Sequence, residues 1–230
     1  MSKIQHLKAG WLGDLPQAFA DQFLDLGTWV HVPAGQLVYS IGAAEHDIYG
    51  IAQGVIRMHI AMNEHEQRLA HMCGPGFWFG DMELVTNSPR IMEIDAAEDL
   101  HLIRIRQSDV EKLSATYPQV WRWIAALVVQ HAGLAISAAD DLMLPSAEKR
   151  LVAVLLRLAG HRFAHPASPP LGSISITQQE LAVAANLSRS SASTVLKQLR
   201  QAGEIRIDYR AITLLDPEGL TKRLAENGGD

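Results

Sequence analysis

Residues 177–203 read TQQELAVAANLSRSSASTVLKQLRQAG, which predicts two short helices with a tight turn between them. Thr177, with Glu three residues later, is a capping-box pattern, because the hydroxyl and the carboxylate satisfy the first free amides of a helix. Asn186 tolerates the left-handed backbone of a tight turn, and Ser188 is a typical N-cap for the second helix. The small side chain of Ala182 lets the two helices cross closely. The stretch therefore predicts a helix-turn-helix.

The second of these helices has one apolar and one polar face. Its apolar residues recur at helical spacing, and the polar face carries Arg189, Ser190, Ser193, Thr194, Lys197 and Arg200. Early Ser, Thr and Arg side chains of a helix in the major groove reach base edges, and later Lys or Arg reach phosphates. We therefore predict binding to double-stranded DNA, against the alternative of a helical hairpin with a solvated face. The segments IRI and ITLL, separated by DYRA, predict an adjacent β-hairpin wing.

Charge is distributed unevenly along the 230 residues, whose net charge is −5. Residues 146–230 hold 11 Lys and Arg against 8 Asp and Glu, whereas residues 1–145 hold 9 against 17. A basic C-terminal third behind an acidic body suits a DNA-binding module attached to a sensor. The N-terminus lacks an apolar signal core, and the longest uninterrupted apolar run covers only residues 123–129. We therefore expect a cytoplasmic protein with no membrane partner.

The region before residue 107 has the pattern of a β domain. Short runs such as TWVHV, VIRMHIAM and LHLIRI alternate with Gly, Pro and Asn turns, which is typical of an antiparallel sandwich or barrel. We predict an α+β chain with three parts: a β-rich sensor over residues 1–116, a long helix over 117–144, and a winged helix-turn-helix over 145–230.

The long helix is predicted over about residues 118–142. Apolar and small residues step along it by three and four, which is the spacing of a coiled-coil seam. The seam consists of Trp121, Ile124, Val128, His131, Ala135, Ala138 and Leu142. We predict a homodimer formed through this seam. The alternative is the central core helix of a monomer.

The order of these parts resembles the CRP/FNR family, the catabolite-activator and fumarate-nitrate-reduction class of bacterial transcription regulators. The resemblance covers nearly the whole chain. It is carried by Gly35, by Gly54 in GVIR, by GPGFWFGD at 74–81, by Pro89-Arg90, and by LSRSSASTVLKQLRQAGEI at 187–205. It implies that the N-terminal part is a β-roll of the cyclic-nucleotide-binding type, a jelly roll that holds a small-molecule effector.

In members that bind cyclic nucleotides, an acidic residue after Phe-Gly bonds the ribose and a later Arg bonds the cyclic phosphate. These positions match Asp81 and Arg90 here, and Arg suits phosphate because it pairs bidentately with its oxygens. The implied pocket comprises Gly80, Asp81, Arg90, Ile91, Leu134, Ala135 and Ile136. Four residues depart from the family pattern. Asp81 replaces Glu, Ile91 is bulky, and Ala135 and Ile136 offer no hydrogen bonds to a base. A polar site loses orders of magnitude in affinity without its donors, so these departures argue against cyclic AMP.

The resemblance also assigns roles on the DNA side. The base-reading positions match Arg189, Ser190 and Thr194, and the phosphate-positioning residues are Thr177, Gln178, Gln179, Ser191 and Lys197. A dimer would read a near-palindromic operator. For the Pro-rich loop 162–171 two alternatives stay open, contact with RNA polymerase or a solvated loop.

The sequence also bears on other cofactors and on enzyme activity. Cys73 is the only cysteine, so a four-cysteine iron–sulfur cluster is excluded. His71, Cys73 and His131 are conceivable haem ligands, and a histidine pair across a dimer seam is a conceivable pH sensor. A metal enzyme of the cupin type requires a His-x-His pair, which the sequence lacks, and no GxSxG or Walker loop is present. We therefore predict a regulator with an unidentified effector rather than an enzyme.

Overall fold

The computed structural model describes residues 2–61, 67–162 and 169–225. Its first half is a β-roll of eight short strands. They are β1 (Thr28–Val32), β2 (Leu37–Tyr39), β3 (Ile48–Gln53), β4 (Ile56–Ile60), β5 (Arg68–Cys73), β6 (Trp78–Phe79), β7 (Met92–Ala96) and β8 (Leu100–Ile105). They form two four-stranded antiparallel sheets, in the orders β1-β8-β3-β6 and β2-β7-β4-β5.

Alternating side chains place the core between the two sheets. On β4, Ile56 and Met58 are buried, whereas Arg57 lies nearer the surface. The turn before β4 depends on Gly54, whose φ of 85° lies in the left-handed region that favours glycine. A Cβ at this position would lie 2.4 Å from the carbonyl oxygen of Asp99, so a side chain would push the turn away from β8.

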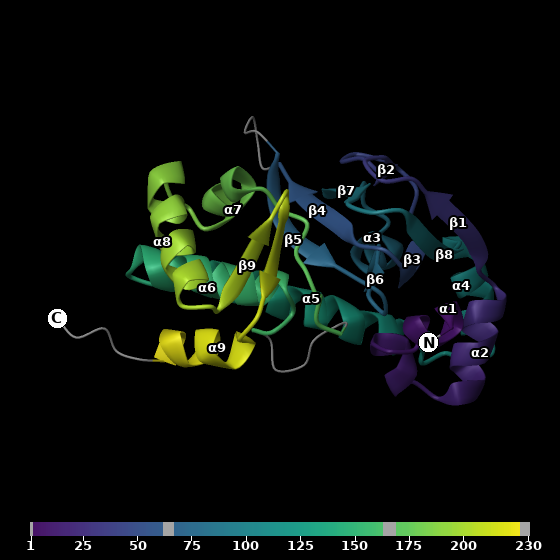
Figure 1. Cartoon of the computed structure of the whole chain (residues 1–230). Coiled ribbons are helices and arrows are strands. Elements are labelled where there is room, and N and C mark those ends of the chain that lie inside the picture. The colour runs from purple at the N-terminus through teal and green to yellow at the C-terminus, as the bar shows by residue number, and fades with distance from the viewer. Residues whose placement is uncertain (1, 62–66, 163–168, 226–230) are drawn as a thin grey trace.

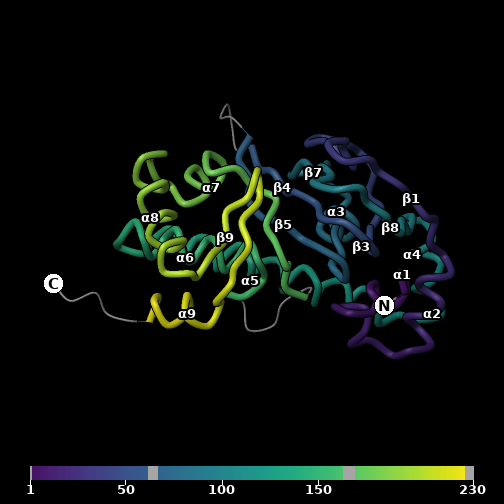
Figure 2. The backbone as a smooth tube through the Cα atoms, viewed as in Figure 1, coloured from purple at the N-terminus to yellow at the C-terminus, as the bar shows by residue number. Residues whose placement is uncertain are grey.

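Short helices pack around the roll. They are α1 (Lys3–Leu7), the 3₁₀ turn η1 (Trp11–Asp14), α2 (Gln17–Asp25), α3 (Asp81–Thr86) and α4 (Gln107–Ser114). Phe19 and Phe23 of α2 stack, and Trp11 and Trp78 meet edge to face beside them. Figure 2 shows α1 and α2 at the end of the roll that lies away from the C-terminal helices.

Helix α5 (Val120–Met143) confirms the predicted long helix and buries part of the predicted seam in the chain's own core. Ile124 is fully buried in the chain's own core, Trp121 packs against that core, and His131 bonds to Asp81 of the roll. Ile124 is therefore not available to a partner chain. The structure leaves a different stripe exposed, one residue further along the helix.

The exposed stripe of α5 has heptad spacing. Val129, Ile136 and Met143 are seven residues apart and are 69%, 70% and 82% exposed. Ala132 and Ala139 lie between them, Ala125 precedes Val129 by four residues, and all three alanines are also exposed. The sequence pattern did not single out this stripe, because both faces of the helix are apolar and only packing against the roll decides which of them is buried.

By length and mean hydropathy alone, α5 could cross a membrane: it has 24 residues, with a mean hydropathy of 1.3 over the relevant window. The same helix contributes Ile124 and Leu127 to the folded core. An apolar stripe left open on such a helix is typical of a protein interface.

The C-terminal part consists of α6 (Ala147–Leu158), α7 (Gln178–Ala184), α8 (Arg189–Gln201), β9 (Ile205–Asp208), β10 (Ala211–Leu214) and α9 (Pro217–Ala225). Figure 1 shows this part beside the roll, with β5 facing it. Strand β5 contacts both α6 and α7, and Val55, Leu69 and Met72 of the roll share one apolar core with these helices. This core contains residues from both sides of the predicted domain boundaries. The division into domains after residues 116 and 144 therefore stays a prediction.

Candidate DNA-binding surface and effector pocket

The helix-turn-helix is built locally as the sequence predicts. Thr177 and Glu180 form a reciprocal capping box at the start of α7, and the hydroxyl of Ser188 accepts a hydrogen bond from the amide of Ser191 at 3.1 Å. Asn186 has a φ of 50°, the left-handed conformation that the turn requires. Ala182 is fully buried at the crossing of the two helices.

Helix α8 presents its polar face to solvent. Leu196 and Leu199 are buried against α6, whereas the exposed side chains of this helix include Arg189, Ser190, Ser193, Thr194, Lys197 and Arg200. Within the described part of the chain, no salt bridge involves Arg189, Lys197 or Arg200. Their positive charge is thus available to an anionic partner. Ser191 is only partly exposed, and its amide and hydroxyl both bond to Ser188, so it lies closer to the helix start than to the open face.

The wing adds residues that the sequence analysis did not single out. Strands β9 and β10 pair in an antiparallel hairpin, and Tyr209 and Arg210 form its tip. A hollow of about 480 Å³ lies between wing and helices; its lining includes Thr177, Gln178, Gln179, Arg189, Tyr209 and Arg210. Tyr209 is 92% exposed. The tetrad DYRA between two strands was the available signal, because the residues that connect two hairpin strands form its exposed turn.

The predicted effector pocket is organised around the buried side chain of Arg90. Its Nη2 donates to the carbonyl oxygen of Asp47 at 2.6 Å, and its Nη1 donates to Glu83 Oε2 at 3.0 Å. The guanidinium also stacks on the ring of Tyr39, 4.2 Å from the centroid. Burial raises the pKa of the Tyr39 hydroxyl, so the ring stays neutral beside the cation. Sequence reasoning missed Glu83, whose only signal was an acidic residue two positions after Asp81.

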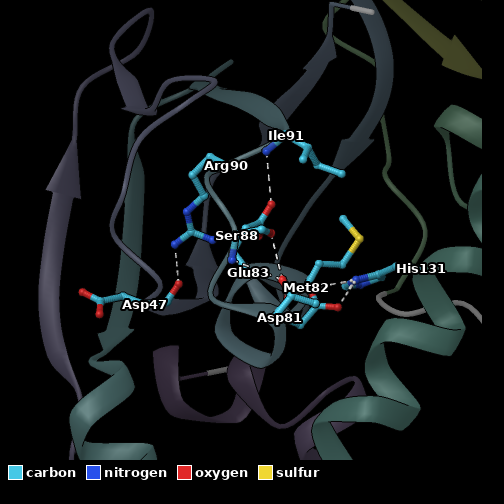
Figure 3. Close-up of polar contacts among 9 residues, drawn as sticks. Asp47, Asp81, Met82, Glu83, Ser88, Arg90, Ile91 and His131 are labelled. Carbon is cyan, nitrogen blue, oxygen red and sulfur yellow. Dashed lines mark hydrogen bonds and ion pairs between the residues drawn. The ribbon is translucent and has the colours of Figure 1, made fainter.

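Asp81 is directed toward the long helix rather than toward Arg90. Both of its carboxylate oxygens lie within hydrogen-bonding distance of His131 Nδ1, at 3.0 and 2.9 Å. The imidazole also stacks on Phe77, with 4.8 Å between ring centroids. Figure 3 shows the two pairs side by side, Glu83 with Arg90 and Asp81 with His131. Both family-type pocket residues are therefore bonded to other side chains of the same chain.

The remaining predicted pocket residues divide into two groups. Gly80 lies under Arg90, because a Cβ there would be 2.8 Å from Nη1, and Leu134 packs against the roll interior. Ile91 is 54% exposed, and Ala135 and Ile136 face solvent. Ala135 and Ile136 therefore do not face the roll of their own chain, and their place in the effector pocket stays a prediction. They lie on the outer side of α5, because the face that carries Leu134 is the one that packs on the roll.

Two family models match this chain. The cyclic nucleotide-binding domain covers residues 29–117, and the Crp-like helix-turn-helix domain covers residues 149–223. Their order is that of the roll and the winged helix described above. The chain belongs to the CRP/FNR family.

CRP/FNR relatives match along most of the chain. The Cyclic AMP receptor protein of Thermus thermophilus is 29% identical over 175 residues, which are 76% of this chain and 78% of that protein. A solved transcriptional regulator of the CRP/FNR family, also from Thermus thermophilus, is 25% identical with a TM-score of 0.65, and the match covers 87% of this chain and all of that one. FixK2 of Bradyrhizobium japonicum shares the fold, with a TM-score of 0.70 at 19% identity, over 88% of this chain and 99% of that one. The protein is thus a CRP/FNR-type transcription regulator that combines a DNA-binding helix-turn-helix with a cyclic nucleotide-binding domain.

The residues that the sequence left open as haem ligands differ in how well they are suited to bind iron. Cys73 is buried in the roll with its thiol directed at Met58 Sδ, and burial raises the pKa of this thiol, which disfavours the thiolate that binds iron. His131 Nδ1 is bonded to Asp81, and burial lowers the pKa of His71 to about 3; neither observation excludes a histidine ligand, because iron binds a neutral imidazole whose other nitrogen is hydrogen-bonded. Among the residues that the structure describes, no group of three His, Cys, Asp or Glu side chains could hold a metal ion.

Proposed function

We propose that this protein is a cytoplasmic homodimeric regulator that binds a near-palindromic operator through α8. The carrying observation is the exposed basic and hydroxyl face of that helix beside the projecting wing tip. In a two-fold dimer the two α8 helices enter successive major grooves about 34 Å apart. Arg189, Ser190 and Thr194 read base edges, and Thr177, Gln178, Gln179, Ser191 and Lys197 position the phosphates.

The exposed stripe of α5 supports the homodimer. Val129, Ile136 and Met143 recur at a spacing of seven residues, and the alanines between them allow two helices to approach closely. In a two-fold dimer the same stripe of each chain covers that of the other, because a two-fold interface uses the same surface on both subunits. Crossing at these alanines also brings Ala135 and Ile136 near the partner's roll.

The effector that we propose for the roll is not cyclic AMP. Asp81 is shorter than the family's Glu and is bonded to His131, and Ile91 occupies the position after Arg90. RNA polymerase is the further partner that we propose, through the loop that follows Arg162. Residues 163–168 of that loop lie outside the described residues.

Selection of bound sites from random duplex DNA tests this function. The full chain is expected to enrich a site with two inverted half-sites one helical turn apart, and to elute as a dimer at micromolar concentration. The selection is repeated with a cell-extract metabolite fraction, and a change in bound DNA reveals an effector. A protein that is monomeric and enriches no sequence would contradict the proposal.

A further inference from the structure

The guanidinium of Arg90 is enclosed by groups of its own chain. Both terminal nitrogens are used, one by Glu83 and one by the Asp47 carbonyl, and the ring of Tyr39 covers one face. Gly80 closes against it, so closely that no Cβ would fit between them. The Arg90 side chain is only 1% exposed, so a ligand has no solvent-facing edge to approach. Only Nε has no hydrogen-bond partner among the described residues.

The carboxylate of Glu83 is fixed as firmly as its partner. Oε2 accepts from Arg90 Nη1, and Oε1 accepts from the amide of Ile91 at 3.3 Å, as Figure 3 shows. The Glu83 side chain is 3% exposed. An anion with two oxygens, one on a guanidinium and one on a backbone amide, is the arrangement in which proteins bind phosphate.

We propose that Glu83 is an internal anion that closes the Arg90 site to phosphate-bearing effectors, including cyclic nucleotides. This inference rests on the proposed function, since it concerns the effector pocket of the same regulator. A phosphate can reach Arg90 only by displacing Glu83, which leaves a buried carboxylate without a cation. Glu83 thereby determines the specificity of the roll, and the wild-type regulator binds its operator without a phosphate-bearing effector.

A purely structural role for the pair makes a different prediction. If Glu83 only held the segment between α3 and β7, its removal would lower stability and leave anion affinity unchanged. If Glu83 occupies the anion site, its removal creates affinity for phosphate. A gain of binding after the loss of a charged residue is the readout that separates these roles.

The test uses the full-length chain with Glu83→Gln and Glu83→Ala, and Glu93→Gln as a matched control on the same roll. Cyclic AMP and inorganic phosphate are titrated by calorimetry in the absence of DNA. The wild type and the control are expected to show no binding up to millimolar concentration. Both Glu83 variants are expected to bind at least tenfold more tightly than the wild type, and Arg90→Ala added to Glu83→Ala is expected to remove that gain.

Three results would overturn the inference. The first is micromolar binding of cyclic AMP by the wild type. The second is a folded Glu83→Gln or Glu83→Ala variant whose affinity for both probes equals that of the wild type. The third concerns the case in which both variants unfold. The inference is then overturned if millimolar phosphate does not restore their folded circular dichroism signal. Operator binding by the same wild-type sample is measured separately, so a failure there counts against the regulator and not against the role of Glu83.

Discussion

Arg157 on α6 donates its Nε to the carboxylate of Asp141 at the end of α5, at 2.6 Å. Asp141 is fully buried and also accepts a hydrogen bond from Arg162, while Nη1 of Arg157 donates to the carbonyl oxygen of Ala70 on β5 at 2.8 Å. One buried ion pair thus joins the long helix, the first helix of the DNA-binding part and the roll. Reorientation of the DNA-binding part relative to the roll requires this connection to break or to move as a unit.

Asp141→Asn should lower the free energy of unfolding by about 3 kcal/mol, because it leaves Arg157 buried without a counter-charge. Asp140→Asn is the matched control. The side chain of Asp140 is 66% exposed and pairs only with Arg162 among the described residues. Removal of its charge should therefore lower the free energy of unfolding by less than about 1 kcal/mol. Urea unfolding of the two variants measures the difference. Equal effects would show that the buried pair does not hold the two parts together.

His71 should make stability fall in acid. Burial, together with the nearby positive Arg157 and His131, lowers the pKa of His71 from 6.5 to about 3. Between these two pH values His71 is protonated in the unfolded chain but neutral in the folded chain. The contribution of His71 to the free energy of unfolding is therefore fully present above pH 6.5 and is lost as the pH falls toward 3. The slope is at most about 1.4 kcal/mol per pH unit. His71→Gln should therefore lose less stability than the wild type between about pH 7 and pH 5, by about 1–2 kcal/mol in urea titrations. Identical pH slopes would contradict this account.

Ile136→Glu should convert the proposed dimer into folded monomers. The side chain is 70% exposed in the single chain, so the monomer tolerates a charge there, whereas an unpaired charge buried in an interface costs several kcal/mol. The dissociation constant should rise by at least about a hundredfold, since about 1.4 kcal/mol corresponds to a factor of ten. Sedimentation equilibrium measures this change. Val85→Glu, at a position 45% exposed on α3, is the control and should remain dimeric. Dimers of Ile136→Glu with wild-type affinity would exclude the α5 stripe as the interface.

The sequence predicted the fold well because its signals were local. The capping box at Thr177, the cap at Ser188 and the left-handed Asn186 each depend on a few neighbouring residues, and the structure has all three. The register of α5 could not be obtained in this way. Stripes at Ile124 and at Ile136 have the same spacing, and only packing against the roll decides which of them is buried.

The pocket was predicted less completely for a similar reason. Asp81 and Arg90 could be located by their motif, but their partners could not. Glu83 reaches Arg90 only because α3 turns it inward. His131 reaches Asp81 only because α5 passes beside the start of α3. The contact between Asp81 and His131 joins residues 50 positions apart, so it depends on the assembled structure and no short pattern contains it.

Arg189→Ala should weaken operator binding and spare non-specific binding. As the first residue of α8, Arg189 is placed to pair with a guanine, and such a contact contributes about 1–3 kcal/mol of discrimination per half-site. Arg200→Ala is the control: it lies in the last turn of α8, so its removal should weaken specific and non-specific DNA about equally. Competition gel shifts at fixed salt measure both. If Arg189→Ala and Arg200→Ala gave the same loss on both DNAs, Arg189 would be a phosphate contact.

Arg210→Gly should lower affinity for all DNA sequences without lowering stability. Arg210 has a φ of 52°, which glycine adopts at no steric cost, so the wing should fold at least as well in the variant. The guanidinium at the projecting tip forms no described salt bridge, and as a phosphate contact it should contribute a salt-dependent part of binding. For each phosphate contact that is lost, one per subunit, the magnitude of the slope of log affinity against log salt concentration should fall by about 1.

Arg206→Ala is the control for the wing tip. Arg206 lies on β9 and is already paired with Asp208 at 3.0 Å, so less of its charge is available to DNA. Its removal should change the salt slope less than Arg210→Gly does. Fluorescence anisotropy over a series of salt concentrations, on operator and on random duplex, measures the slopes. An unchanged slope for a stably folded Arg210→Gly would show that the wing tip stays clear of the DNA, and α8 alone would then determine how the domain sits in the groove.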